Sequence, residues 1–213
     1  MYMKNYSTLA FSGLSYIVMA IITTFVVENI DDKEWDTPTL YDVVHESVPV
    51  YPPKWITDHF VFFFMIYTIF RWGFIDIDYL SIYFLSLTIL LAFRLVTFTV
   101  TQTPPPTKIG SKYREKHCRK KILPHVGFTL NKYVYSCVDN MFSAHTAHIM
   151  VALTLIMLFS DNFAEKLALG LISLVSIFSI TSSRLHYTSD VVVSSMLSPL
   201  VVFAVYKNLF YKL

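Results

Sequence analysis

Residues 7–27 read STLAFSGLSYIVMAIITTFVV, a run of 21 residues without a charged side chain. An α-helix needs about 20 mostly apolar residues to cross the hydrocarbon core of a bilayer. Lys4 precedes the run, and an acidic stretch that begins at Glu28 follows it. A cleaved signal peptide is the alternative, but the run is longer than the usual signal core and no clear small-residue cleavage site follows it. The run therefore predicts a first transmembrane helix.

The rest of the chain has the same apolar character. Of the 213 residues, 54% are hydrophobic and only 15% are charged, a balance too apolar for the surface of a soluble domain. We therefore predict an all-α integral membrane protein with six transmembrane helices in a single membrane domain, residues 1–213. The predicted spans are 7–27, 55–72, 79–100, 144–160, 167–182 and 191–210.

Two long loops of opposite charge interrupt the predicted spans. The loop that follows the first span is acidic, and the loop that follows the third span is basic. With six spans, the loops after the first, third and fifth spans must share one membrane face, which we call the active face. The basic run 108–121 is more typical of a surface that touches lipid phosphates than of a nucleic-acid site. We therefore predict no nucleic-acid partner.

Two histidine motifs lie at the membrane boundary of the active face. The first places His145 where the basic loop enters the fourth span, and the second places His186 just before the sixth. Residues four apart share one face of a helix, so Asp190 is predicted to hydrogen-bond one imidazole nitrogen of His186. The other nitrogen would then be directed at a substrate, as in nucleophilic catalysis. This arrangement predicts a catalytic site at His145, His186 and Asp190.

The chemistry that needs two histidines is phosphoryl transfer through a phosphohistidine. One histidine attacks phosphorus, while a second protonates the leaving oxygen and later deprotonates the acceptor. A lone histidine in a membrane protein more often packs than reacts. The joint placement of His145, His186 and Asp190 on one face favours catalysis.

With these motifs the chain resembles the sphingomyelin synthase family, a branch of the lipid phosphatase and phosphotransferase superfamily. Three family signatures occur in order from about Pro49 onward: R-x-x-T-x-x-x-T-x-x-P-x-P, C-G-D-x-x-x-S-G-H-T and H-Y-T-x-D-V-V. The chain departs from the family at Val138 and Ala144, where the signature has glycines, and at Arg184, where the family usually has a histidine. The matching residues are Arg94, Thr97, Thr101, Pro104 and Pro106, then Cys137, Asp139, Ser143, His145 and Thr146, then residues 186–192.

The resemblance implies a phosphosphingolipid synthase that needs no cofactor and no metal. His186 would attack the phosphorus of a glycerophospholipid donor, and Asp190 would hold its tautomer. His145 would protonate the leaving diacylglycerol and then activate the hydroxyl of the ceramide acceptor. Phosphocholine is the favoured headgroup, before phosphoethanolamine and phosphoinositol. The predicted substrate-binding residues are Arg94, which would clamp the phosphate, together with Asp139, Ser143 and Tyr187.

The orientation and the reaction have alternatives. The resemblance implies cytosolic termini and a site that faces the Golgi lumen or the cell exterior, whereas the excess of Lys and Arg on the active face favours the reverse. A lipid phosphatase or phospholipase C-like hydrolase would use the same residues with water as acceptor, and a related transferase would use diacylglycerol. A catalytically silent scaffold or lipid-binding protein is the non-enzyme alternative. Association into a homo-oligomer is left open.

The remaining histidines and both cysteines are predicted to lie outside the site. His148 shares a helix face with His145 but is expected to pack in the bundle. Cys118 and Cys137 share the basic loop, either as a disulfide on a lumenal face or as free thiols. A headgroup-sensing role is predicted for Asn140, Met141 and Phe142. Ordinary loop positions are predicted for His45, His59, His117 and His125.

Overall fold

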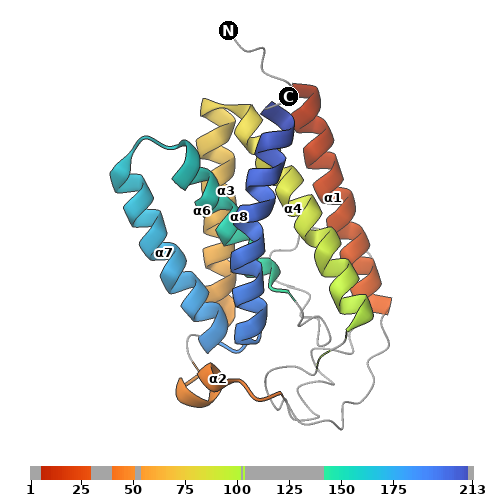
Figure 1. Ribbon diagram of the computed structural model, residues 1–213, viewed down its shortest axis with the longest axis vertical. Coiled ribbons are helices and arrows are strands. Elements are labelled where there is room, and N and C mark those ends of the chain that lie inside the picture. The colour runs from red at the N-terminus through yellow and green to blue at the C-terminus, as the bar shows by residue number, and fades with distance from the viewer. Residues whose placement is uncertain (1–5, 30–39, 51–53, 102, 104–141, 211–213) are drawn as a thin grey trace.

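All the secondary structure that we describe is α-helical. The computed structural model describes residues 6–29, 40–50, 54–101, 103 and 142–210, and these residues contain no strand. Each of the six predicted apolar ranges coincides with one long helix of the bundle in Figure 1. The long helices are α1 (Tyr6–Asn29), α3 (Lys54–Ile75), α4 (Ile77–Val100), α6 (Ala144–Phe159), α7 (Phe163–Ser182) and α8 (Thr188–Phe210).

Five of these helices are long and apolar enough to cross a bilayer. The exception is α6, whose 16 residues rise about 24 Å at about 1.5 Å each. That length is shorter than the hydrocarbon core of about 30 Å. The structure therefore supports an all-α membrane protein with five helices of spanning length among the described residues.

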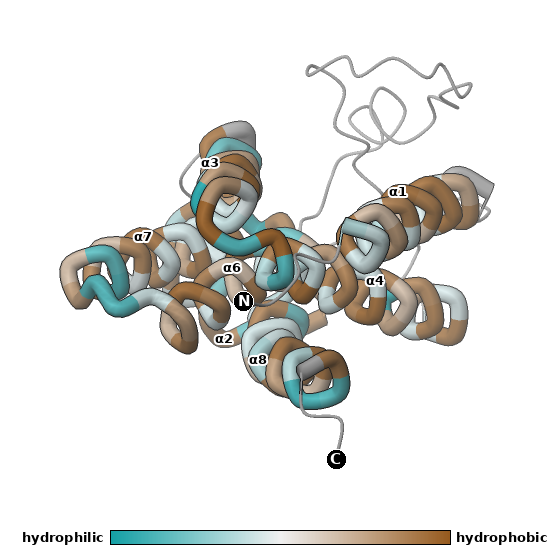
Figure 2. Tube along the Cα trace, turned by 90° about the horizontal axis from the view of Figure 1, so that it is seen from above, coloured by the Kyte–Doolittle hydropathy of each residue, from teal (hydrophilic) through white to brown (hydrophobic). Residues whose placement is uncertain are grey.

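The short helix α6 lies at the centre of the bundle. It packs against α3, α4, α7 and α8, and Figure 2 shows these helices around it. Its side chains Ile149, Leu155 and Ile156 are completely buried in the core. α1 packs on α4 at the edge of the bundle. α6 therefore contacts protein on most of its surface, while the other helices have one side left for lipid.

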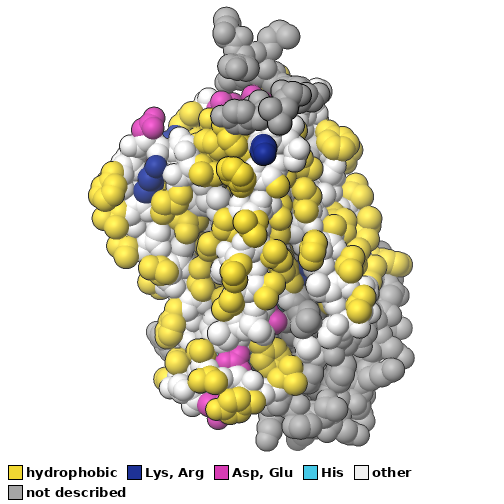
Figure 3. Space-filling view, in the orientation of Figure 1, with side chains coloured by type: hydrophobic (Ala, Val, Ile, Leu, Met, Phe, Trp, Pro, Cys, Tyr) yellow, Lys and Arg dark blue, Asp and Glu magenta, His cyan; other side chains and the backbone are white. Residues whose placement is uncertain are grey.

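The outer surface of the bundle is also apolar. Phe74 on α3 is 79% exposed and Leu174 on α7 is 66% exposed. Figure 3 shows hydrophobic side chains over the middle of one face, with most charged side chains toward its two ends. Exposed apolar surface of this extent marks contact with lipid or with a protein partner. Together with the helix lengths, it is the surface expected of a protein in a bilayer.

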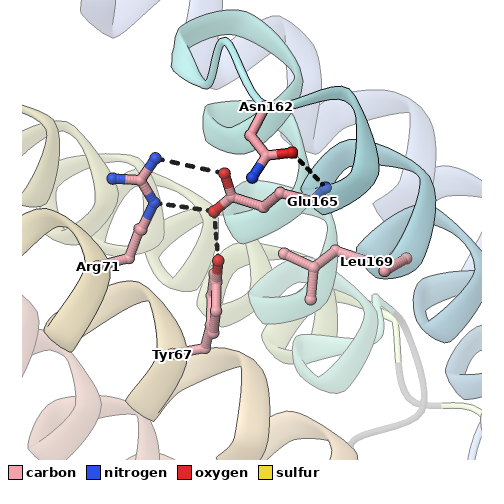
Figure 4. Close-up of a pocket in the computed structure, with 6 residues that line it drawn as sticks. Tyr67, Arg71, Asn162, Glu165 and Leu169 are labelled. Carbon is pink, nitrogen blue, oxygen red and sulfur yellow. Dashed lines mark hydrogen bonds and ion pairs between the residues drawn. The ribbon is translucent and has the colours of Figure 1, made fainter.

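A cluster of polar side chains ties α3 to α7 at the end of the bundle away from the histidine motifs (Figure 4). The Arg71 guanidinium donates to both carboxylate oxygens of Glu165, over 2.8 and 3.3 Å. The hydroxyls of Tyr67 and Ser160 donate to the same carboxylate. We call these four residues the opposite-end cluster. Three of them, Tyr67, Arg71 and Glu165, line an open pocket of about 460 Å³. Both carboxylate oxygens of Glu165 accept hydrogen bonds, so the cluster is typical of a structural contact between helices.

A second polar cluster lies inside the bundle, around His148 of α6. The hydroxyl of Tyr16 on α1 lies 3.3 Å from its Nε2, and the hydroxyl of Tyr83 on α4 lies 3.2 Å from its Nδ1. The prediction that His148 packs instead of joining the site agrees with these contacts. The cluster joins three helices through one imidazole.

The loop between α1 and α3 contains a short helix that the sequence did not predict. α2 (Val43–Ser47) lies at the lower end of the bundle in Figure 1, with Asp42 as its N-cap. The prediction of His45 as an ordinary loop residue is wrong, because His45 lies in α2 and is only 5% exposed. His59 is exposed, but it lies on α3 and not in a loop. His117, His125, Cys118 and Cys137 lie outside the described residues.

Candidate active site

Four side chains from separate elements meet at the lower end of the bundle. Asp58 lies in the second turn of α3, and His145 lies in the first turn of α6. His186 lies in the turn between α7 and α8, and Asp190 in the first turn of α8. The rings of His145 and His186 are 5.7 Å apart between centroids. The two histidine motifs, which are 41 residues apart in the chain, therefore lie side by side, and their joint catalytic role remains a prediction.

His145 is held by a carboxylate that the sequence analysis did not assign to the site. Its Nε2 lies 3.0 Å from Oδ1 of Asp58, which is buried with a side-chain exposure of 2%. The Nδ1 atom of His145 is also buried, and no hydrogen-bond partner for it occurs among the described residues. One nitrogen of this imidazole is therefore oriented by an acid, and the other is left for a substrate atom.

His186 lies beside Asp190 at a longer distance than predicted. The gap between His186 Nδ1 and Asp190 Oδ2 is 4.0 Å, which suits an ion pair but exceeds a hydrogen bond. Asp190 Oδ2 instead accepts from the backbone N–H of Tyr187 at 3.1 Å. Catalytic hydrogen bonds are often long without substrate and tighten when it binds. The expected pairing is therefore present, but not as the predicted hydrogen bond.

A hydrogen-bonded chain connects the two motifs behind the histidines. Ser143 caps α6, because its hydroxyl accepts from Thr146 N–H at 3.2 Å. The backbone N–H of Ser143 donates to Ser194 Oγ at 2.8 Å, and that hydroxyl donates to the carbonyl of Asp190 at 2.7 Å. All of these groups are buried. The start of α6 is thus fixed against the first turns of α8, which sets the separation of the two histidines.

Both motifs contain a residue with strained backbone. Phe142 has a φ of 82° and Arg184 a φ of 55°, in the left-handed region that side chains rarely adopt. Each residue lies two or three positions before a histidine of the site. Such strain persists only where the surrounding structure holds it, and it is common at active sites. The two turns are therefore held in conformations that their sequences do not favour.

The backbone around the histidines favours a negative charge. α3 and α8 begin at the lower end of the bundle in Figure 1, and α6 begins farther inside it, with its N-terminus directed toward the same end. A helix N-terminus carries a partial positive charge and free N–H groups, which stabilise anions such as phosphate. No group of three acidic, histidine or cysteine side chains that could hold a metal occurs in the described parts of the chain. The site thus has acid–base groups and an electrostatic environment suited to a phosphate ester.

The predicted substrate-binding residues lie in different surroundings. Ser143 is completely buried, and its observed contacts are those of a helix cap. The hydroxyl of Tyr187 accepts from Leu40 N–H at 3.2 Å. Arg94 is half-buried near the end of α4 that lies on the active face. Asp139 is outside the described residues, so for all four residues contact with substrate remains a prediction.

Two residues of the headgroup-sensing prediction, Asn140 and Met141, also lie outside the described residues. The third, Phe142, is 4% exposed and belongs to the apolar core.

Asp58 is a candidate site residue that the sequence analysis missed. The signal was present, because Asp58 is a carboxylate inside an apolar stretch that was itself predicted to span the bilayer. Ionisable groups in such positions are costly, and they are functional candidates with a partner to be found. What the sequence could not supply was the partner, since His145 lies 87 residues away.

The fold and the site together define a class, which is a multi-helix membrane protein with two histidine–carboxylate pairs at one boundary. Residues 136–208 match the family model described as PAP2 superfamily C-terminal. This part of the chain is therefore similar to the C-terminal region of the PAP2 superfamily, which confirms the predicted resemblance to the sphingomyelin synthase-like branch of that superfamily.

Two curated relatives agree with this resemblance. The chain is 32% identical over 119 residues to "Phosphatidylinositol:ceramide inositolphosphotransferase 2" of Arabidopsis thaliana, with 54% of this chain and 39% of the relative covered. It is 30% identical over 116 residues to "Phosphatidylinositol:ceramide inositolphosphotransferase 3" of the same plant, with 53% and 40% covered. The chain thus spans less than half the length of the curated relatives that it matches.

Proposed function

We propose that this protein is a phosphosphingolipid synthase, which moves a phosphate-linked headgroup from a glycerophospholipid to ceramide. The observation that carries the proposal is the pair of histidines 5.7 Å apart, each with its own buried carboxylate. A two-step transfer through a covalent intermediate needs one nucleophile and one acid–base group on the same phosphorus. The names of both relatives describe a transfer to ceramide, which supports the acceptor.

The first step forms the phosphohistidine. A nitrogen of His186 attacks the phosphorus of the donor, and the bond from phosphorus to the diacylglycerol oxygen breaks. Protonated His145 gives its proton to that oxygen, and diacylglycerol leaves. Asp190 stabilises the positive charge that develops on His186, in the role of the acid in a catalytic triad.

The second step regenerates the enzyme. Neutral His145 takes the proton of the primary hydroxyl of ceramide, whose oxygen attacks the phosphohistidine. The bond from phosphorus to nitrogen breaks, and the phosphosphingolipid leaves. Asp58 holds Nε2 of His145 at 3.0 Å, so Nδ1 is the nitrogen that we assign to proton transfer.

The exposure of the two rings suggests the direction from which lipids arrive. The His145 side chain is 26% exposed, whereas the His186 side chain is 5% exposed. A substrate phosphate therefore reaches His186 by passing His145. This order suits the chemistry, because the leaving and attacking oxygens then lie on the side of the acid–base group.

We infer that α6 crosses the membrane together with the other five long helices. α6 is surrounded by protein, so a length below that of a lipid-facing span is sufficient. Six crossings bring the starts of α3, α6 and α8 to one face, with both termini on the other. We propose that this active face is directed toward the Golgi lumen or the cell exterior, as the family resemblance implies.

The headgroup is the open point of the proposal. The sequence favoured phosphocholine, whereas the names of both relatives specify phosphatidylinositol as donor. We therefore give phosphoinositol priority in the test. Water or diacylglycerol as acceptor would use the same four side chains, so the acceptor must be tested with the donor.

The test is a vesicle assay with purified protein and fluorescent ceramide. Phosphatidylinositol, phosphatidylcholine and phosphatidylethanolamine are supplied one at a time, and His186→Ala is the inactive control. A fluorescent phosphosphingolipid that forms with the wild type only supports the proposal and identifies the headgroup. Release of diacylglycerol without that product would indicate a hydrolase or another acceptor. No reaction with any donor would favour the non-catalytic scaffold.

A further inference from the structure

A segment from the loop between α1 and α3 holds the start of α8. Asp42 caps α2 with Oδ1, which accepts from Val44 N–H at 3.0 Å and His45 N–H at 3.3 Å. The same carboxylate also reaches Thr188. Its Oδ2 accepts from Thr188 N–H at 2.7 Å, and its Oδ1 accepts from the Thr188 hydroxyl at 2.8 Å. One buried acid thus caps one helix and binds the first residue of another.

Three more contacts join the same two segments. Leu40 N–H donates to the Tyr187 hydroxyl at 3.2 Å, and the His45 ring stacks on the Tyr187 ring with centroids 6.0 Å apart. The Arg184 guanidinium donates to the His45 carbonyl at 2.6 Å. These contacts fall on both sides of His186 in the chain. The segment 40–48 therefore holds the turn of the candidate nucleophile at both of its ends.

Strain in the turn gives a reason for support from outside. Arg184 has the left-handed φ of 55°. Its N–H donates to the Thr181 carbonyl at 3.0 Å, whereas the next N–H, of Leu185, donates to the Ile180 carbonyl over a long 3.4 Å. Asp190 orients His186 from within the motif, but it does not hold the preceding residues 184 and 185. A nucleophile that must meet phosphorus in line loses rate steeply when its position shifts by about 1 Å.

We propose that segment 40–48 is a clasp that positions His186 through Asp42, which makes Asp42 a positioning residue for headgroup transfer. The effect on catalysis rests on the proposed function, while the contact itself does not. The segment comes from the first extramembrane loop, so this loop takes part in building the site.

The test compares three variants of the clasp region. Asp42→Asn keeps one side-chain oxygen to cap α2, but an NH₂ group replaces the second oxygen and cannot accept from Thr188 N–H. Thr188→Val removes only the hydroxyl donor. Glu46→Gln is the matched control, since its exposed side chain lies on the same helix and the clasp contacts do not involve it. Each variant is the full chain in detergent or vesicles.

The first readout is hydrogen exchange of the peptide that covers residues 184–190, which needs no activity. We expect Asp42→Asn to speed exchange of this peptide by about tenfold, Thr188→Val by less, and Glu46→Gln not at all. The second readout is steady-state transfer, normalised to folded protein. We expect kcat of Asp42→Asn to fall by about tenfold or more with the donor KM unchanged.

The outcomes separate the clasp from the proposed function. Unchanged exchange at residues 184–190 in Asp42→Asn would overturn the clasp. Faster exchange with an unchanged kcat would overturn the positioning role and leave a purely structural contact. Faster exchange in a protein whose wild type transfers no headgroup would support the contact and show that the proposed function had failed.

Discussion

On α3, Asp58 lies near the first end and Arg71 near the last, and their hydrogen-bonded surroundings differ. Near the active face, Asp58 meets one nitrogen of His145, whose other nitrogen has no partner among the described residues. Near the opposite face, Arg71 meets Glu165, whose carboxylate also accepts from Tyr67 and Ser160. Both clusters join α3 to another helix. The pair of Asp58 and His145 leaves His145 Nδ1 without a hydrogen bond among the described residues, whereas both carboxylate oxygens of Glu165 accept hydrogen bonds.

In an apolar bundle, the number of hydrogen bonds in a polar cluster distinguishes a catalytic role from a structural one. A fully bonded polar cluster has no group left for a substrate, so it can only join helices. An incompletely bonded cluster costs stability, and it persists where function requires it. The strained turns at Phe142 and Arg184 occur beside the incomplete cluster. The same comparison gives a set of tests.

The largest expected effect is on the nucleophile. His186→Ala should lower headgroup transfer by about a thousandfold or more, because no other group can form the covalent intermediate. The vesicle assay measures it, with His59→Ala on the exposed side of α3 as the matched control. A variant that retained more than a tenth of the wild-type rate would remove His186 from the mechanism.

The second-largest expected effect concerns Asp58, near the first end of α3. Asp58→Asn should lower kcat by about a hundredfold, because His145 loses the carboxylate that orients it for proton transfer. The melting temperature in detergent should change little by comparison. Asp78→Asn, on α4 at the opposite end of the bundle, is the control. A fall in melting temperature with an unchanged kcat per folded molecule would make Asp58 structural, like Arg71.

Substitutions in the opposite-end cluster should lower stability and leave kcat unchanged. Arg71→Met leaves the Glu165 carboxylate without its cation, so the free energy of unfolding should fall by about 3 kcal/mol, while kcat per folded molecule is retained. Thermal melting and the vesicle assay together measure this. The double variant Arg71→Met with Glu165→Leu should recover much of the loss, because no unpaired charge remains. A large loss of kcat in folded Arg71→Met would break the comparison.

The smallest expected effect concerns pH and the clasp. Burial alone raises the pKa of Asp42, but hydrogen bonds from Thr188 and from His45 N–H outweigh burial and hold this pKa below its usual value. The carboxylate therefore adds stability above its unfolded pKa of about 3.9, and this stability is lost as pH falls through the lower folded pKa. Arg184, His45 and Tyr187 are the other titratable groups beside it.

Melting of the wild type and of Asp42→Asn at a series of pH values tests this. The difference in melting temperature should be constant above about pH 5 and shrink below about pH 4. A difference that grew as the pH fell would contradict the assigned sign.

The helices were predictable because lipid imposes a strong constraint on sequence. Each long apolar range became one helix, since a backbone in hydrocarbon must satisfy its hydrogen bonds internally. The short helix α2 was not predicted, because its five residues carry no period and its order comes from contacts with residues 184–188. Long-range contacts of this kind leave no local pattern.

The same reasoning explains the site. The sequence was sufficient to predict His145, His186 and Asp190 as site residues, because each belongs to a motif with fixed spacing. Asp58 and Asp42 were missed because each acts on a partner more than 80 residues away. The 4.0 Å gap between His186 and Asp190 was also unpredictable, since it depends on Asp190 accepting from Tyr187 N–H.

The Tyr16, Tyr83 and His148 cluster has a consequence for how the bundle assembles. Helices that meet in lipid gain little from apolar burial, so many rotations and depths of α1 against α4 have similar energies. The imidazole of His148 favours one of these arrangements, because Tyr16 reaches it in one position of α1 only. If α1 slid by one turn, about 5.4 Å, Tyr16 would leave Nε2 of His148 without its hydroxyl. The depth of α1 in the bundle is thus fixed by a residue that lies more than a hundred positions later in the chain.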